Sequence, residues 1–290
     1  ENLYYHFYID LNGDNLRRED INVAVLRIEG TNCEEESHLA FSRLGANAEK
    51  VHIKQLLGQD VTEEEKRDLE DYQILMFPGG FSAGDYIRAG AIFGARLKSA
   101  LEDDIKEFVE SGKPVLGVCN GFQVLVELGL LPAIDEVMTD VPKAALETND
   151  SNKFECRPSL LKIKNNSTCV FTNEYDKDEI VLFPSAHAEG KFVLDDKENL
   201  EGLKDNNQIV FRYTSPEGEK VDYPWNPNGS IENIAGVCNP KGNVLGLMPH
   251  PERVFFDYTN PDWTRKNLEK SRGDGKLIFK SALKYVEDNF

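Results

Sequence analysis

Short apolar runs alternate with helix-like segments through the first half of the chain. Residues 23–28, 73–77 and 115–118 are almost uninterrupted apolar runs, which is typical of strands buried on both faces of a parallel sheet, and residues 48–53 suggest another strand. Residues 95–111 have the clearest helical period, because Leu97, Leu101, Ile105 and Phe108 recur on one face and Gly112 ends the segment.

Three further helices are predicted from their end signals and apolar spacing. Asn32 is placed to cap a helix that ends at Gly45, with Glu35 closing a capping box. Thr62 would begin an exposed helix over residues 62–71, and another helix starts near Phe122. Alternation of strands and helices predicts a parallel sheet with helices on both faces.

The pattern changes after residue 132, where short apolar pieces are separated by Asn, Gly, Pro and Asp. These pieces predict strands at residues 160–163, 180–183, 209–213, 234–237 and 244–248, and residues 277–286 predict a closing amphipathic helix. The predicted fold class is therefore α/β: a mostly parallel open sheet flanked by helices, with an antiparallel extension.

One domain is predicted over residues 22–290, because no linker or internal repeat divides this part of the chain. Residues 1–21 are interpreted as an N-terminal extension. Its opening, Glu-Asn-Leu-Tyr, resembles the front of an engineered protease-cleavage site, so we interpret the extension as engineered in part. A native N-terminal strand is the alternative.

Composition excludes several classes of protein. The formal net charge of −18 disfavours binding to nucleic acids and to anionic membrane surfaces. No apolar run approaches the roughly 20 residues of a membrane helix, and the start has no signal-peptide pattern. The five cysteines are irregularly spaced without a C-x-x-C pair, so we expect reduced thiols, no metal site and a cytoplasmic location.

Cys119 is the candidate nucleophile, because it stands in the sequence Gly-Val-Cys-Asn-Gly at the junction of a predicted strand and helix. This G-x-nucleophile-x-G form is a strand-to-helix elbow with Cys in place of Ser. Glycine allows the close backbone approach of such a turn, and the helix N-terminus favours the thiolate. The alternative is an inert buried cysteine at the end of a core strand.

His250 and Glu252 are the candidate base and its orienting acid. They follow a predicted strand as His-Pro-Glu, and in an extended backbone residues i and i+2 face the same side. Pro251 is expected to keep the backbone non-helical here. Glu252 would then hold one ring nitrogen of His250 and leave the other for the thiol proton. A surface turn with a solvated Glu is the alternative.

A candidate oxyanion hole completes the set. Acyl transfer from a thiolate places negative charge on oxygen, which backbone N–H groups can stabilise. The turn Gly79-Gly80 follows a core strand at the carboxyl edge of the predicted sheet, where sites of α/β proteins form. The second donor would be the N–H of Asn120, the residue after the nucleophile.

These motifs together resemble the signatures of class I (triad) glutamine amidotransferases. The motifs are Gly-Val-Cys-Asn-Gly-Phe-Gln at 117–123, Pro-Gly-Gly-Phe-Ser at 78–82 and His-Pro-Glu-Arg at 250–253. The similarity is greatest to the glutaminase subunits of phosphoribosylformylglycinamidine synthase, through Gly-Thr-Asn-Cys at 30–33, residues 84–92, residues 228–236 and residues 242–248. The resemblance implies a flavodoxin-like glutamine amidotransferase domain.

The resemblance also implies residue roles. Cys119, His250 and Glu252 would form the catalytic triad. Gly80 and Asn120 would offer the oxyanion N–H groups. Gly79, Gln123 and His187 would contact glutamine, with His187 beside the triad rather than in it.

The implied function is hydrolysis of L-glutamine to glutamate and ammonia through a Cys119 thioester. The ammonia would pass to a synthetase subunit that converts formylglycinamide ribonucleotide to formylglycinamidine ribonucleotide in purine biosynthesis. This chain lacks both glycine-rich phosphate-loop motifs, so it would bind no cofactor, and ATP and magnesium would be used by the partner. A small third subunit is also implied. The alternatives are a glutamine-binding regulatory subunit and another cysteine hydrolase of the same α/β superfamily.

Three features depart from the family pattern or extend it. The family favours Tyr at Ala83, beside the glutamine pocket, and Gly at Ala188, where a positive φ would strain alanine. The aromatic and basic segment at 255–275 is longer than usual. An ordinary packed loop is the favoured interpretation of that segment, and a contact with a partner subunit is the alternative.

Overall fold

The strand order of the main sheet explains where the functional site forms. In the computed structural model, which describes residues 16–134, 136–265 and 273–290, nine strands form one sheet in the order β2-β1-β3-β4-β11-β10-β9-β6-β7. The pairs from β2 to β11 are parallel, and the pairs from β11 to β7 are antiparallel. The predicted fold class is confirmed, and the parallel half has the flavodoxin-like order.

The strands of the main sheet are β1 (Asn22–Arg27), β2 (Asn47–His52), β3 (Ile74–Phe77), β4 (Val115–Val118), β6 (Glu155–Ile163), β7 (Ile180–His187), β9 (Ile209–Tyr213), β10 (Ile234–Cys238) and β11 (Val244–Leu247). Strands β5 (Ala144–Thr148) and β8 (Glu189–Leu194) form a separate antiparallel pair.

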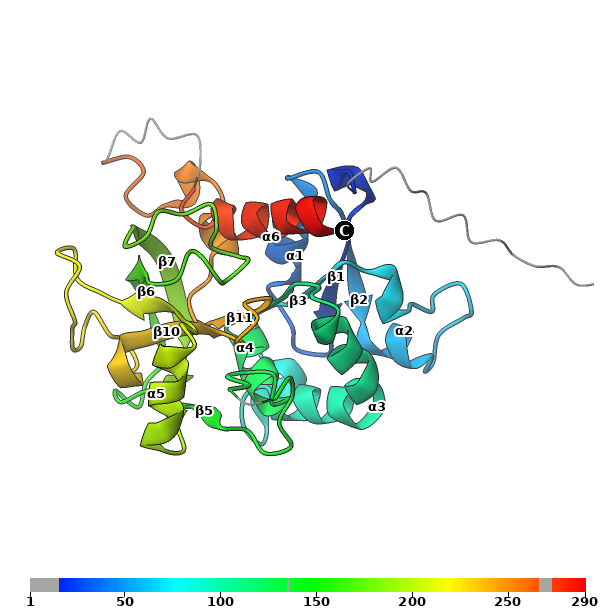
Figure 1. The fold of residues 1–290 in the computed structure, drawn as a ribbon, viewed down its shortest axis with the longest axis horizontal. Coiled ribbons are helices and arrows are strands. Elements are labelled where there is room, and N and C mark those ends of the chain that lie inside the picture. Colours follow the sequence, from blue (N-terminus) through cyan, green and yellow to red (C-terminus); the bar gives the residue numbers. More distant parts are fainter. Residues whose placement is uncertain (1–15, 135, 266–272) are drawn as a thin grey trace, which may run out of the picture.

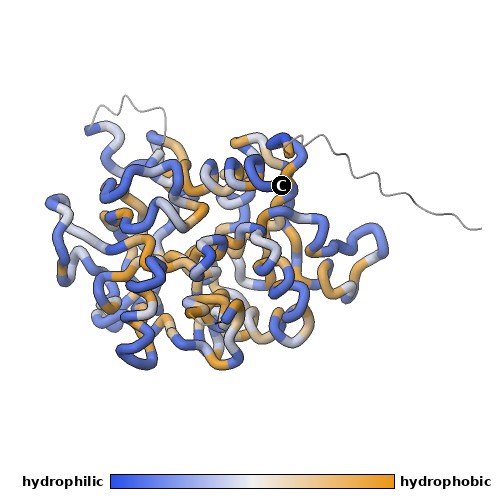
Figure 2. Tube along the Cα trace, viewed as in Figure 1, coloured by the Kyte–Doolittle hydropathy of each residue, from blue (hydrophilic) through white to orange (hydrophobic). Residues whose placement is uncertain are grey.

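Helices cover both faces of the main sheet. They are α1 (Glu34–Ser42), α2 (Ile53–Leu57), α3 (Ala91–Glu110), α4 (Asn120–Glu127), α5 (Lys197–Asp205) and α6 (Lys276–Asn289). Helices α1 and α6 touch each other on one side of the sheet, and α3 and α4 touch each other on the other side (Figure 1). Hydrophobic segments follow the central strands, and hydrophilic segments lie mainly at the periphery (Figure 2).

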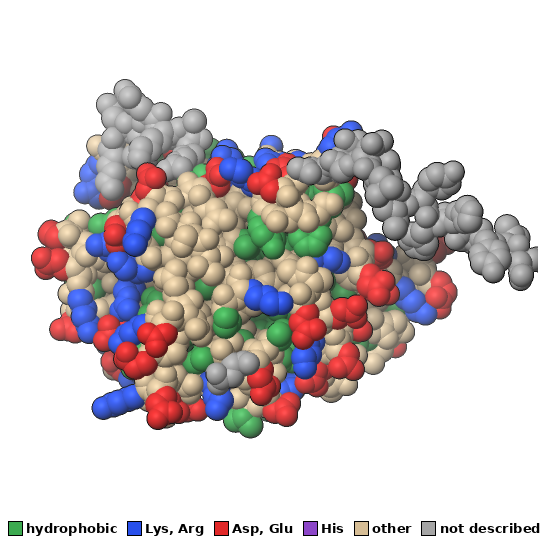
Figure 3. Space-filling model, viewed as in Figure 1, with side chains coloured by type: hydrophobic (Ala, Val, Ile, Leu, Met, Phe, Trp, Pro, Cys, Tyr) green, Lys and Arg blue, Asp and Glu red, His purple; other side chains and the backbone are tan. Residues whose placement is uncertain are grey.

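The core strands β3 and β4 are buried at every position, as their unbroken apolar runs predict. Acidic and basic side chains are interspersed over the face of the molecule in Figure 3. No helix in the described ranges is long and apolar enough to cross a membrane. The predicted boundary between residues 21 and 22 stays a prediction, since residues 1–15 lie outside the described part.

Two of the helix predictions need correction. Residues 62–71 form turns and a short 3₁₀ helix, Leu69–Asp71, instead of an exposed helix. Thr62 does hold the Glu65 carboxylate, but the segment has no apolar face with which to pack. Helix α1 begins after Cys33 with no side-chain cap, so the predicted Asn32 capping box is absent.

Candidate active site

Cys119 occupies a strained elbow between β4 and α4. Its backbone has φ 52° and ψ −109°, which a non-glycine residue rarely adopts. A Cβ on Gly121 would lie 1.9 Å from the carbonyl oxygen of Phe77 in β3, and a Cβ on Gly117 would lie 2.6 Å from Leu125 Cδ1. The two glycines therefore let α4 start directly against the sheet, as the elbow motif predicted.

Replacing Gly121 by alanine is expected to lower the free energy of unfolding by about 1–3 kcal/mol, because the new methyl group would overlap the carbonyl group of Phe77, which is backbone of a core strand and cannot easily move. Urea denaturation measures this change. The matched control is Gly202→Ala in α5, where the added carbon meets only the Ile134 side chain, and its effect should stay within about 1 kcal/mol. Equal stability of the two variants would contradict the packing argument.

His250 and Glu252 form a buried hydrogen-bonded pair. His250 Nδ1 lies 2.5 Å from Glu252 Oε1, and both side chains are almost fully buried. The predicted pairing is found, but its predicted cause is wrong. Pro251 has αR angles and is followed by a 3₁₀ turn, Glu252–Val254, so a tight helical turn brings the two side chains together instead of an extended backbone.

The environment of His250 favours its charged form. Burial lowers the pKa of His250. The carboxylate of Glu252 and the thiolate form of Cys119 have the opposite effect, and together they raise the pKa well above its usual 6.5. With Nδ1 on Glu252, the buried Nε2 is left without a hydrogen bond in the described structure. This nitrogen is therefore available to the thiol proton.

A second cysteine, Cys33, lies close to His250 and Arg253, which the sequence did not predict. Its Sγ is 3.1 Å from Arg253 Nη2 and 4.0 Å from His250 Nδ1. Cys33, His250 and Glu252 are close enough together to hold a metal ion. However, Nδ1 is already hydrogen-bonded to Glu252 and a guanidinium contacts the sulfur, so the donor set fits an acid–base pair better than a cation.

The Gly-Gly turn after β3 lies against the triad. A Cβ on Gly79 would be 2.7 Å from His250 Cε1 and 3.4 Å from Cys119 Cβ, so only glycine fits there. The Gly79 carbonyl accepts from Asn32 and Cys33, and no described group accepts the N–H of Gly80. That N–H is available to a ligand.

Asn120 ties the turn to the elbow. It is the first residue of α4, where backbone N–H groups have no partner within the helix. Its side-chain Oδ1 accepts from Ser82 N–H at 3.2 Å, and its Nδ2 donates to Gln123 Oε1 at 3.0 Å. Gly80 and Asn120 are thus placed as predicted, although their oxyanion role stays a prediction.

A small cavity of about 60 Å³ opens beside Cys119. It is lined by Gly80, Phe81, Asp85, Ala89, Cys119, Gln123, Ala186, His187, Ala188 and Glu189. Gln123 Nε2 donates to the Glu189 carbonyl at 2.5 Å, which joins α4 to β8. Larger hollows exist elsewhere, such as one of about 480 Å³ beside Asp68 and Lys113, but it contains no cysteine or histidine.

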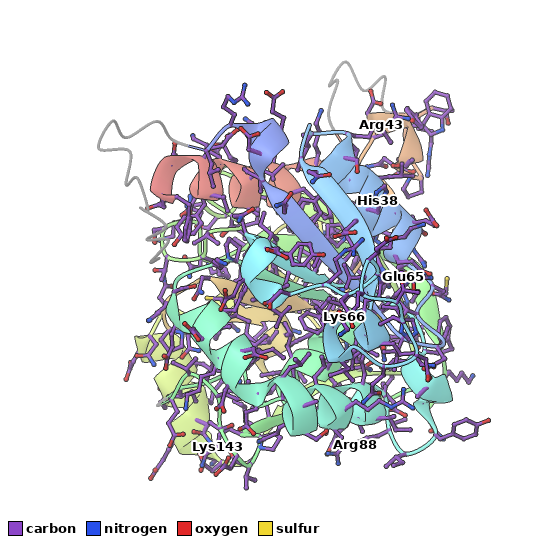
Figure 4. All side chains as sticks on the ribbon, turned by 90° about the vertical axis from the view of Figure 1, so that its right-hand side faces the viewer. His38, Arg43, Glu65, Lys66, Arg88 and Lys143 are labelled. Carbon is purple, nitrogen blue, oxygen red and sulfur yellow. The ribbon has the colours of Figure 1, made fainter. Side chains whose placement is uncertain are left out.

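Two of the residues that line the cavity, Asp85 and Glu189, are acidic. Burial, together with the nearby carboxylate of Glu189, raises the pKa of Asp85 to about 6. Arg88, next in sequence to the lining residue Ala89, lies at the surface (Figure 4), where its guanidinium is paired with Glu127 at 2.6 and 2.7 Å.

Ala83 and Ala188 are the two positions that depart from the family pattern. Ala83 has a positive φ of 51°. Ala188 does not have a positive φ, so the backbone strain expected at Ala188 is absent.

His187 lines the same cavity from β7 and is buried. Its Nδ1 lies 3.1 Å from Asn149 Oδ1, and its Nε2 has no hydrogen-bond partner within the described residues. Burial, together with the charge of the nearby His250, lowers the pKa of His187 to about 3. His38 on α1 (Figure 4) and His52 at the end of β2 do not line the cavity.

This buried neutral histidine should make the protein less stable in acid. An unfolded chain binds a proton near pH 6.5 and the folded chain only near pH 3, so stability falls as pH falls through this range. Between pH 8 and pH 5 the loss through His187 should be about 2 kcal/mol. Urea unfolding of the unsubstituted protein and of His187→Phe measures it. Parallel pH curves would contradict the assignment.

Residues 255–265 support the packed-loop interpretation in part. Phe255 packs against Phe279 of α6 with ring centroids 6.1 Å apart, and Phe256 stacks on Tyr258 at 4.9 Å. Trp263 is half exposed. The basic residues Lys266, Lys270 and Arg272 lie outside the described residues.

Comparison with known proteins agrees with this geometry. Residues 20–286 match the family model of the CobB/CobQ-like glutamine amidotransferase domain. The chain is 56% identical over 275 residues to phosphoribosylformylglycinamidine synthase subunit PurQ of Archaeoglobus fulgidus, covering 93% of this chain and 98% of that protein. It is 46% identical over 256 residues to the subunit of the same name from Picrophilus torridus, covering 88% and 95%.

A solved structure shows the same arrangement of the backbone. A chain in the structure of PurLQS from Thermotoga maritima matches with a TM-score of 0.68 and 33% identity, covering 92% of this chain and 99% of that chain.

Proposed function

Because this chain belongs to the CobB/CobQ-like glutamine amidotransferase family, we propose that it acts as the glutaminase subunit of a phosphoribosylformylglycinamidine synthase. The observation that carries the chemistry is a strained elbow cysteine that lines a small cavity and lies, across Gly79, from a buried His250–Glu252 pair. L-Glutamine is the substrate, and its side-chain carboxamide enters the cavity.

The reaction begins with transfer of the Cys119 proton to His250 Nε2. The thiolate attacks the carboxamide carbon, and the Gly80 and Asn120 N–H groups receive the negative charge on oxygen. The C–N bond then breaks as the His250 imidazolium returns its proton to nitrogen, which leaves as ammonia. A water molecule, deprotonated by His250, hydrolyses the remaining thioester to glutamate.

The ammonia is passed to a separate synthetase subunit. A synthetase subunit would use it, together with ATP and magnesium, to convert formylglycinamide ribonucleotide to formylglycinamidine ribonucleotide, and a small third subunit would complete the assembly. This chain itself would need no cofactor, and the reaction would take place in the cytoplasm. Phosphoribosylformylglycinamidine synthase subunits are the chain's relatives, which supports this assignment.

Apolar side chains at the cavity mouth favour docking of the synthetase subunit there. Phe81 lines the cavity and is half exposed, and Tyr86 and Ile87 of the same segment are 89% and 78% exposed. Large exposed apolar groups gathered on one segment are typical of interaction sites. A partner seated on them would cover the cavity and keep water from protonating ammonia.

The experiment is to label the protein with a glutamine-analogue electrophile and to assay it with the synthetase subunit. The proposal expects a single label on Cys119, protection by L-glutamine, and glutamine-dependent formation of formylglycinamidine ribonucleotide. Labelling of the exposed Cys156 instead, or no hydrolysis with the partner present, would contradict it.

A further inference from the structure

His187 has a ring nitrogen for which the fold provides no partner. The side chain is 3% exposed, and Nε2 makes no hydrogen bond within the described residues. Leaving a buried polar atom unpaired costs about 1–3 kcal/mol, so such atoms in folded proteins need an explanation. His187 also lines the cavity that holds Cys119, so a bound molecule can supply the missing partner.

The neighbouring hydrogen bonds identify which nitrogen carries the proton. Asn149 Nδ2 donates to the carbonyl oxygens of Lys153 and His187 at 2.9 and 2.8 Å, which fixes the orientation of the amide. Asn149 Oδ1 is therefore an acceptor, and it also receives the Gly190 N–H at 3.1 Å. His187 Nδ1, 3.1 Å from the same oxygen, must donate to it. Nε2 is left with a lone pair and no proton.

The two buried histidines near the sulfur have opposite tendencies. His187 stays neutral at physiological pH because burial lowers its pKa to about 3, whereas the Glu252 carboxylate favours the charged form of His250. Environments that separate two titratable groups in this way assign their roles in acid–base chemistry. The ring of His250 can carry a proton to the substrate, whereas Nε2 of His187 can only accept a hydrogen bond.

We propose that Nε2 of His187 accepts a hydrogen bond from the carboxamide nitrogen of bound glutamine and then from the ammonia that leaves. The inference rests on the proposed function. When the C–N bond breaks, the proton added to nitrogen comes from His250, and His187 neither gives nor takes one. An N–H held by His187 limits the rotation of the nitrogen that His250 protonates. An acceptor without a proton also cannot convert ammonia to ammonium.

The test compares two substrates that differ only in the leaving group. His187→Phe keeps a ring of similar size and removes both nitrogens. With the synthetase subunit present, kcat/KM for L-glutamine should fall roughly 10-fold or more, the effect of about 1.4 kcal/mol in the transition state. Hydrolysis of L-glutamate 5-methyl ester, whose leaving group has no N–H, should fall less than about 3-fold. Equal losses on the two substrates would overturn the proposal.

A second measurement does not depend on the folding of that variant. In Cys119→Ala, with histidine labelled by ¹⁵N, the Nε2 resonance of His187 should start in the unprotonated range and shift upfield on addition of L-glutamine. An Nε2 that carries a proton, or a resonance unmoved at saturating glutamine, would overturn the proposal. Failure of the proposed function is distinguishable, because then the unsubstituted complex would not hydrolyse glutamine at all.

Discussion

Replacing Cys119 by serine is expected to lower the rate of glutamine-dependent product formation by roughly 10³-fold or more, because a hydroxyl group at this elbow is a far weaker nucleophile than a thiolate. The change is nearly isosteric at a side chain that is 7% exposed, so the fold should be retained. The measurement is the rate of product formation by the complex at saturating L-glutamine.

Two controls make this result specific to the cysteine. Product formation from added ammonium chloride should be unchanged, because the acceptor chemistry belongs to the partner. Cys156→Ser, at an exposed thiol on β6, should leave both rates unchanged. Residual glutamine hydrolysis within about 10-fold of the unsubstituted complex would exclude Cys119 as the nucleophile.

The parts of the fold that the sequence predicted are those where local pattern and burial agree. Strand β4 was predicted over the residues that form it, because the run contains no polar residue and the Cys-Asn-Gly turn follows it directly. The antiparallel extension was also predicted, since β9 and β10 are short apolar runs between turn residues. In these elements almost every side chain faces the core.

Elements with mixed surfaces were missed. Strand β8 alternates half-buried and buried residues over its first four positions, and within the described part of the chain it pairs only with β5, whose last two residues are exposed. Helix α5 is mainly polar and buries only Asn199 and Leu203. Their apolar signal is weak because each packs at the margin of the molecule, and only the tertiary contacts determine their structure.

The site was predictable to the extent that each group follows its motif. Cys119, His250 and Glu252 were found because a nucleophile elbow and a His-x-Glu spacing are local patterns. Cys33 was not assigned a role, because its contacts with Arg253 and His250 join residues more than 200 positions apart. The unpaired nitrogen of His187 could not be predicted either, because it depends on a contact with Asn149, which follows β5 and is 38 positions away in the sequence.

Glu252 offers a test of how the triad is held. Glu252→Gln should lower kcat/KM for L-glutamine by about 10²–10⁴-fold, because an amide can no longer stabilise the imidazolium of His250 or fix its tautomer. The carboxylate is also the main group that opposes burial in setting the His250 pKa. Without it, burial dominates, and the pKa of His250 must fall.

The pH profile separates this effect from a general loss of structure. Deprotonation of His250 ends the reactive thiolate–imidazolium pair on the alkaline side, so the alkaline limb of kcat/KM should move to lower pH in Glu252→Gln. The matched control is Glu36→Gln. The half-exposed carboxylate of Glu36 lies 3.9 Å from Arg253, and its replacement should alter kcat/KM less than about 3-fold. An alkaline limb that stays in place while the rate falls would mean that Glu252 holds the position of His250 without setting its charge.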